Sequence, residues 1–95
     1  MTPASASRER AADVAAAAKT LADPIRVEIL DVLRDAGGEV CQCQLQPRFD
    51  VSQPTLSHHL KKLTDAGLIE VERRGKWAYY SIDDDPLEVL RSWLS

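Results

Sequence analysis

The chain has 95 residues, 44% of them hydrophobic and 28% charged, which is typical of one small soluble domain. The net charge of −3 argues against a general nucleic-acid binder, and no segment is long enough to span a membrane. No secretory signal is recognisable, and two cysteines one residue apart do not make a disulfide framework, so we expect a cytoplasmic protein.

The N-terminal part predicts one helix after a short lead. Residues 1–7 read as a disordered lead, and residues 8–95 as a single domain. The stretch 8–22 is rich in alanine, and a helical stripe is formed by Val14, Ala18 and Leu21. Because a domain of this size buries only about 60–65% of its unfolded surface, we expect the helix to pair with a second copy of the chain.

A second helix is expected to start at Pro24, with Asp23 as its capping residue. Gly37 is expected to stop this helix. A short extended piece at 39–41 and a brief helix over about 43–49 come next.

The stretch from Ser52 to Gly67 predicts a longer amphipathic helix. Ser52 can cap it, Gly67 can end it, and Gln53, which precedes a proline, is expected to be the last residue outside it. The inward stripe is Leu56, Leu60 and Leu63. The outer side is formed by Pro54, Ser57, His58 and Lys61, with Thr55, His59 and Lys62 on a flank. No acidic residue occurs between Ser52 and Thr64, so nothing on this face would repel phosphate.

Two stretches of alternating polarity, 68–74 and 77–82, predict a β-hairpin that turns at Gly75. Its tip carries the basic residues Arg73, Arg74 and Lys76, and its aromatic residues Trp77, Tyr79 and Tyr80 are expected to pack within the hairpin. A last short helix is expected from Pro86. The order helix, helix, short helix, long helix, hairpin, helix is that of a winged helix-turn-helix, a mainly α fold with a small β-hairpin (α+β). Helices at both ends would make it a homodimer.

The charge distribution favours DNA binding by the long helix and the hairpin. Residues 51–81 carry five basic and three acidic side chains, a net +2 in a chain of net −3. The candidates for base and phosphate contacts are Gln53, Thr55, Ser57 and His58. The candidates for phosphate contacts are Lys61, Lys62, Arg73, Arg74 and Lys76. Taken alone, the outer face of this helix would be interpreted as a solvated helix face. The basic hairpin and the preceding short helix favour binding to double-stranded DNA instead. If the protein is a dimer, its operator is expected to be palindromic.

Five motifs carry a resemblance to a known family: Ala22-Asp-Pro-x-Arg26, Glu39-Val-Cys-x-Cys-x-Leu45, Ser52-Gln-Pro-x-x-Ser-His-His-Leu60, Leu63-x-x-Ala-Gly-Leu68 and Arg74-Gly-Lys-Trp-x-x-Tyr80. Over residues 20–82 the chain resembles the ArsR/SmtB family of dimeric bacterial repressors, which leave DNA when metal ions or metalloids bind. It is most similar to the arsenic-responsive branch, where a Cys-x-Cys pair precedes the recognition helix. That branch has a third cysteine where this chain has Gln46, and the family's zinc site of Asp and His on the last helix has no match.

The chemistry of Cys41 and Cys43 leaves three interpretations open. Soft thiolates select trivalent arsenic or antimony, and the resemblance implies such a sensor site. The pair can also be a buried core cysteine with an incidental neighbour, or a redox switch, although a bridge between residues two apart would be strained. In a regular helix such residues point about 200° apart, so binding both sulfurs to one atom would distort the helix start and release DNA.

The sequence therefore predicts a transcriptional repressor without catalytic activity. No resident cofactor is expected, and the inducer is arsenite, antimonite or a methylated trivalent arsenical, with water, an exogenous thiol or a methyl group as the third ligand. The alternatives are a repressor with a redox or other thiol-reactive inducer, and a protein-interaction module without specific DNA binding. A thiol enzyme is disfavoured, because the pair is not the Cys-x-x-Cys of oxidoreductases.

Overall fold

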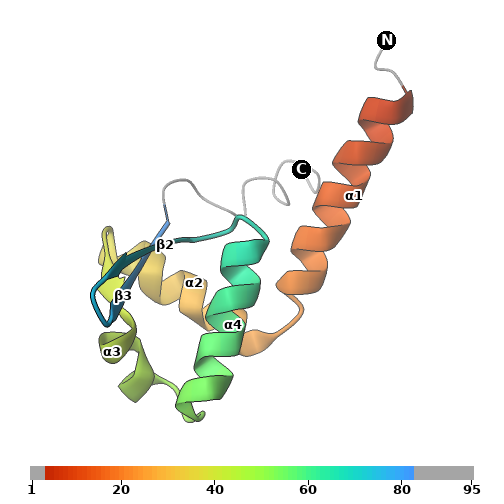
Figure 1. Ribbon diagram of the computed structural model, residues 1–95. Coiled ribbons are helices and arrows are strands. Elements are labelled where there is room, and N and C mark those ends of the chain that lie inside the picture. Colours follow the sequence, from red (N-terminus) through yellow and green to blue (C-terminus); the bar gives the residue numbers. More distant parts are fainter. Residues whose placement is uncertain (1–3, 83–95) are drawn as a thin grey trace.

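The computed structural model describes residues 4–82 (Figure 1). In chain order its elements are α1 (Ala4–Thr20), α2 (Pro24–Ala36), β1 (Val40–Cys41), α3 (Gln42–Leu45), the 3₁₀ helix η1 (Gln46–Arg48), α4 (Gln53–Asp65), β2 (Glu70–Arg74) and β3 (Trp77–Ser81). This is a winged helix-turn-helix, with α3 and α4 as the helix pair and β2–β3 as the wing, so the predicted fold is confirmed. The helix expected from Pro86 lies outside the described residues. None of the described helices is long and apolar enough to cross a membrane.

The first helix starts earlier than the sequence pattern indicated. α1 begins at Ala4, so residues 4–7, expected in the disordered lead, are helical, and it ends at Thr20. The alanines and serines of its first turn include no glycine or proline that would stop a helix. Figure 1 shows α1 extending away from the other helices. The half-buried Leu21, just after its end, packs against the core.

α2 is closed at both ends by the residues expected to do so. Asp23 Oδ1 accepts a hydrogen bond from the N–H of Ile25 at 2.9 Å, and Pro24 occupies a position where no N–H is needed. Gly37 follows the helix with a φ of +66°, and its N–H donates to the carbonyl of Leu33 at 3.3 Å. The two caps therefore set where α2 begins and ends, and the chain then enters β1.

The short helix begins one residue earlier than expected, at Gln42, and soon gives way to η1, where a proline removes an amide donor. Cys41 is its N-cap, with an extended backbone. The Cys41 sulfur accepts a hydrogen bond from the N–H of Cys43 at 3.3 Å, and the N–H of Cys41 donates to Gln44 Oε1 at 2.9 Å. This is a capping box in which a cysteine takes the place usually held by serine or threonine.

α4 begins at Gln53, which is therefore the first helical residue and not the last residue outside the helix. The bias against helical backbone before a proline is outweighed here by the cap, since Ser52 Oγ accepts a hydrogen bond from the N–H of Thr55 at 3.4 Å. Gly67 ends the helix with a φ of +75°, as expected. The predicted inward stripe is fully buried: Leu56, Leu60 and Leu63.

The predicted hairpin is part of a three-stranded antiparallel sheet with the order β1-β3-β2. The extended piece before α3 pairs with β3, with Val40 opposite Tyr80 and Cys41 opposite Tyr79. The buried side of the sheet joins the leucines of α4 in one core through Val40, Ala78 and Tyr80. Because β1 runs directly into α3, the sheet places Cys41 at the base of the wing.

Candidate DNA-binding face and thiol site

The outer face of α4 presents most of the residues predicted to contact DNA. Gln53, Thr55, His58, Lys61 and Lys62 are exposed. Ser57 is half-buried. His59 is only 7% exposed, and its Nδ1 accepts a hydrogen bond from the Nε–H of Arg26 at 3.1 Å. His59 therefore packs at the flank of the helix, as expected, and does not belong to the outer face.

The two arginines of the wing project to opposite sides of the sheet. Arg73 is paired with the buried Ala78, so it lies on the side that faces α4. Arg74 lies on the other side, where its Nη2 contacts Glu39 Oε1 at 2.7 Å and Glu72 Oε2 at 2.9 Å. The guanidinium of Arg74 also lies 4.5 Å from the centre of the Tyr79 ring.

These contacts hold Arg74 on the back of the wing. The hydrogen bond and charge of Arg74 lower the pKa of the Glu72 carboxyl below its usual 4.5. The hydrogen bonds to Glu72 and Glu39 in turn raise the pKa of Arg74. Both carboxylates are exposed, so the energy of these pairs is reduced by solvent screening. The pair with Glu39 joins β2 to the residue that precedes β1, whereas the pair with Glu72 lies within β2.

Cys41 and Cys43 are joined in a disulfide, with their Cα atoms 5.1 Å apart. The expectation that these residues point apart from a regular helix is wrong, because Cys41 lies outside the helix in the extended N-cap position. The two sulfurs therefore meet without any unwinding of α3. Cys41 is 5% exposed, whereas Cys43 is exposed, so the pair is reached from the Cys43 side.

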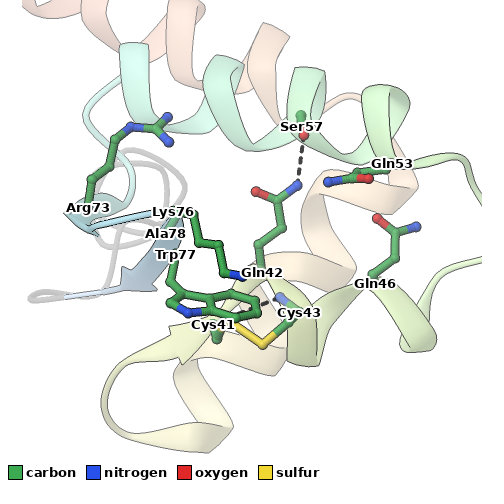
Figure 2. Close-up of a pocket in the computed structure, with 10 residues that line it drawn as sticks. All are labelled: Cys41, Gln42, Cys43, Gln46, Gln53, Ser57, Arg73, Lys76, Trp77 and Ala78. Carbon is green, nitrogen blue, oxygen red and sulfur yellow. Dashed lines mark hydrogen bonds between the residues drawn. A yellow bond between two sulfur atoms is a disulfide. The ribbon is translucent and has the colours of Figure 1, made fainter.

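The cysteine pair opens into a cleft of about 490 Å³ between α3, the N-terminal half of α4 and the wing (Figure 2). The cleft is lined by Cys41, Gln42, Cys43, Gln46, Gln53, Ser57, Arg73, Lys76, Trp77 and Ala78. The structure thus brings together both predicted thiol ligands, two of the predicted base-reading residues and two of the predicted phosphate contacts. The other predicted DNA contacts lie outside the cleft.

Gln42 and Trp77 line the cleft, although neither was predicted to have a role in the site. Gln42 extends from α3 to α4, and its Nε2–H donates to Ser57 Oγ at 2.7 Å (Figure 2). Trp77 is 47% exposed and lines the cleft, and Lys76 Nζ lies 5.2 Å from the centre of its ring. The prediction that Trp77 packs within the hairpin is therefore wrong. The one signal in the sequence is the position of Gln42 between the two cysteines. For Trp77 the alternation of the strand gave no such signal.

The donors available for a metal or metalloid are few. Within residues 4–82, no group of three or more His, Cys, Asp or Glu side chains is placed to hold a metal ion. A soft ion bound here would take two ligands from Cys41 and Cys43. Its further ligands would not be His, Cys, Asp or Glu side chains of the described residues. Gln46, at the position of the third cysteine, lines the same cleft but offers only an amide.

The family model for bacterial regulatory proteins of the arsR family matches residues 23–71, from the cap of α2 into β2. The chain belongs to the ArsR family. Members of this family are transcriptional regulators that bind DNA operators and are not enzymes, so the prediction that this ArsR-family protein is a DNA-binding repressor without catalytic activity is confirmed.

Named relatives and solved structures agree with this assignment. An arsenical resistance operon repressor of Staphylococcus xylosus is 43% identical over 72 residues, which are 76% of this chain and 67% of the relative. A repressor of the same name from Bacillus subtilis is 45% identical over 74 residues, 78% of this chain and 70% of the relative. The crystal structure of an ArsR family transcriptional regulator matches with a TM-score of 0.77 at 27% identity, covering 86% of this chain and 82% of that one.

Proposed function

We propose that this ArsR-family repressor binds a palindromic operator as a homodimer and leaves it when trivalent arsenic or antimony binds to Cys41 and Cys43. The observation that carries the proposal is that both cysteines line the same cleft as two predicted DNA-contacting residues of α4 and two of the wing: Gln53, Ser57, Arg73 and Lys76. A ligand held by the sulfurs is therefore next to the surface that meets DNA. The names of the two relatives, both arsenical resistance operon repressors, support the same inducer class.

In this proposal α4 enters the major groove. The side chains that contact base edges or nearby phosphates are Gln53, Thr55, Ser57 and His58. The side chains that contact phosphates are Lys61, Lys62, Arg73 and Lys76. Arg74, expected among these contacts, supports them by holding the wing through its two ion pairs.

The homodimer is proposed to form through helices near the two ends of the domain predicted over residues 8–95. α1 extends away from the body of the fold (Figure 1). Its side chains include the half-buried Val14 and Ala17. The helix predicted near the C-terminus is its proposed partner in the dimer contact. Two α4 helices related by a two-fold axis would lie about one turn of DNA apart, which is why we expect a palindromic operator.

The reduced cysteine pair is the proposed inducer site. Thiolates are soft ligands that select thiophilic ions, and the exposure of Cys43 gives such an ion access from the cleft. Since the chain contains only two cysteines, the third position on trivalent arsenic is filled by water, an exogenous thiol or a methyl group. The inducers proposed are arsenite, antimonite and methylated trivalent arsenicals, and no resident cofactor is proposed.

The test is a titration of the reduced, operator-bound protein, followed by fluorescence anisotropy of the DNA. Arsenite, antimonite and methylarsenite are expected to release the DNA. Zinc is not, because two sulfurs do not supply the four ligands of a structural zinc site, and cadmium is titrated beside it for comparison. Cys41→Ser and Cys43→Ser are expected to bind the operator as the wild type does and to stay bound. If both serine variants release DNA normally, the inducer assignment is wrong.

The same experiment examines the DNA assignment. Replacing Gln53 and Ser57 by alanine is expected to weaken specific binding and to leave the dimer intact. Salt-dependent binding to a palindrome distinguishes a repressor from a protein-interaction module, because the module would show none. Unchanged operator affinity in the double variant contradicts the role given to α4.

A redox inducer is a second candidate, and the Cys41–Cys43 disulfide is the observation that favours it. A peroxide is the oxidant class considered: two thiols and one hydrogen peroxide give one disulfide and two waters, and the two electrons pass from sulfur to the peroxide oxygens. Peroxide is then expected to release the wild type from DNA, and a dithiol reductant to restore binding. Release by peroxide without release by arsenite would favour this candidate over the metalloid sensor.

A further inference from the structure

One polar link connects the cysteine segment to the recognition helix. Gln42 lies between Cys41 and Cys43 and is the first residue of α3. Its Nε2–H donates to Ser57 Oγ on α4 at 2.7 Å, as Figure 2 shows. Among the hydrogen bonds of residues 4–82 given by the structure, this one alone joins α3 to α4; α3 otherwise contacts mainly η1, β3 and β1.

We propose that Gln42 is the positioning residue that transmits the state of the cysteine pair to Ser57, and thereby sets how strongly an inducer lowers operator affinity. The inference rests on the proposed function above. It concerns a residue that contacts neither the inducer nor DNA in the proposal. One side-chain hydrogen bond thus couples the cysteine pair to the DNA-binding face of α4.

The backbone explains why Gln42 responds to the sulfurs. Its two peptide neighbours are the ligand residues themselves, and Cys41 also caps α3 through its sulfur. In the structure the two sulfurs are joined directly, and the Cys41 sulfur still accepts from the N–H of Cys43. An ion bound between the sulfurs holds them farther apart than a direct bond does, so the backbone of Gln42, which lies between the two cysteines, must adjust.

The hydroxyl chemistry explains why Ser57 transmits the change. Ser57 Oγ accepts the hydrogen bond from Gln42, which leaves its own O–H free to donate to a phosphate or a base acceptor. The bond from Gln42 therefore orients a donor on the half-buried side of the DNA-binding face. When Gln42 is displaced, the hydroxyl rotates freely and the amide needs another acceptor in the same cleft, so DNA binding weakens.

The test compares Gln42→Met with Gln44→Met in the full chain. Methionine keeps the length and packing of Gln42 but cannot donate to Ser57. Gln44 accepts from the N–H of Cys41 and has no described link to α4, so its variant disturbs the cap of α3 alone. Operator affinity is measured with and without arsenite, and arsenite binding to the DNA-free protein is measured separately.

We expect Gln42→Met to bind arsenite as tightly as the wild type while the ratio of operator affinities without and with arsenite falls about fivefold, the typical effect of one side-chain hydrogen bond. Gln44→Met is expected to keep the wild-type ratio. In a Ser57→Ala background, Gln42→Met is expected to change the ratio no further, because its partner is already missing. By linkage, DNA must also weaken arsenite binding less in Gln42→Met than in the wild type.

The outcomes separate this inference from the proposed function. If wild-type protein is not released by arsenite, the proposed function fails and the coupling role falls with it. If the wild type is released and Gln42→Met keeps the same affinity ratio, only the coupling role is overturned. An equal loss in Gln42→Met and Gln44→Met also overturns it, because general disturbance of α3 then explains the effect.

Discussion

Arg73 and Arg74 are adjacent in the chain, yet they serve opposite sides of the wing. Arg73 pairs across the sheet with Ala78 and lines the cleft beside α4, whereas Arg74 pairs with Trp77 and binds Glu39 and Glu72 on the back. The register of a two-residue turn decides this division, because side chains alternate along a strand. Two identical charges in the sequence therefore have different expected roles.

Arg73→Ala is expected to weaken binding to every DNA sequence to a similar degree. The residue faces α4 without a described ion pair, so its charge is available to a phosphate. Loss of one phosphate contact reduces the slope of log affinity against log salt by about 1. A salt series of anisotropy titrations with operator and with random DNA measures this slope.

Arg74→Ala is the matched control for that prediction. Its charge is engaged by two carboxylates, so we expect a smaller change in the salt slope and a loosened wing. Loss of the contact to the Tyr79 ring should be visible as a change in the NMR shifts of that ring. A salt slope reduced as much by Arg74→Ala as by Arg73→Ala would contradict the division of roles.

Glu72 is expected to titrate below its usual pKa of 4.5. Because its pKa is lowered in the folded state by Arg74, its contribution to stability is complete above pH 4.5 and is lost as the pH falls through the lowered pKa. Carboxyl carbon NMR of the wild type and Arg74→Ala measures both values. In Arg74→Ala the pKa is expected to return toward 4.5; an unchanged pKa would show that Arg74 is not its cause.

The sequence predicted those features that depend on neighbours along the chain. Leucines at helical spacing placed the core face of α4, and Asp23 and Ser52 placed two helix starts, because caps and periodicity are local. The pairing of β1 with β3 was not predicted, since a strand of two residues carries no periodicity. The cap role of Cys41 was missed because cysteine is not among the usual capping residues.

The contents of the site depended on packing between distant segments. The Gln42–Ser57 hydrogen bond joins residues fifteen positions apart, and it exists only because α3 and α4 meet at one angle. Both side chains are ordinary polar residues in the sequence, so neither pattern nor charge marks them as partners. The exposure of Trp77 follows the alternation of β3, because the buried Ala78 and Tyr80 lie on the opposite face; its place in the cleft beside the cysteines depends on packing between distant segments.

His59 and His58 are expected to act on different properties of the protein. His59→Ala removes a buried ring and the acceptor for Arg26, so we expect the free energy of unfolding to fall by about 1–3 kcal/mol in urea titrations. His58→Ala removes an exposed ring, and we expect a stability change within about 0.5 kcal/mol and weaker operator binding. The opposite assignment of the two effects would mean that the outer face of α4 has been misidentified.

Gln46→Cys is expected to convert the two-sulfur site into a three-sulfur site. Gln46 lines the same cleft as Cys41 and Cys43, so a sulfur there is near the open side of the pair. With a third protein ligand in place of an external one, arsenite affinity is expected to rise about tenfold or more, which corresponds to about 1.4 kcal/mol. X-ray absorption should count three sulfurs around arsenic in the variant and two in the wild type when no exogenous thiol is present.

The position tolerates this change because only half of the Gln46 amide is in use. Its Nε2–H donates to the carbonyl of Val51 at 2.7 Å, while its Oε1 is buried without a hydrogen-bond partner among the described residues. Losing the single bond to Val51 is expected to cost about 1 kcal/mol of stability. Gln46→Ser carries the same loss without a sulfur and is the matched control. Equal arsenite affinity in Gln46→Ser and Gln46→Cys would mean that position 46 does not reach an ion held by the cysteine pair.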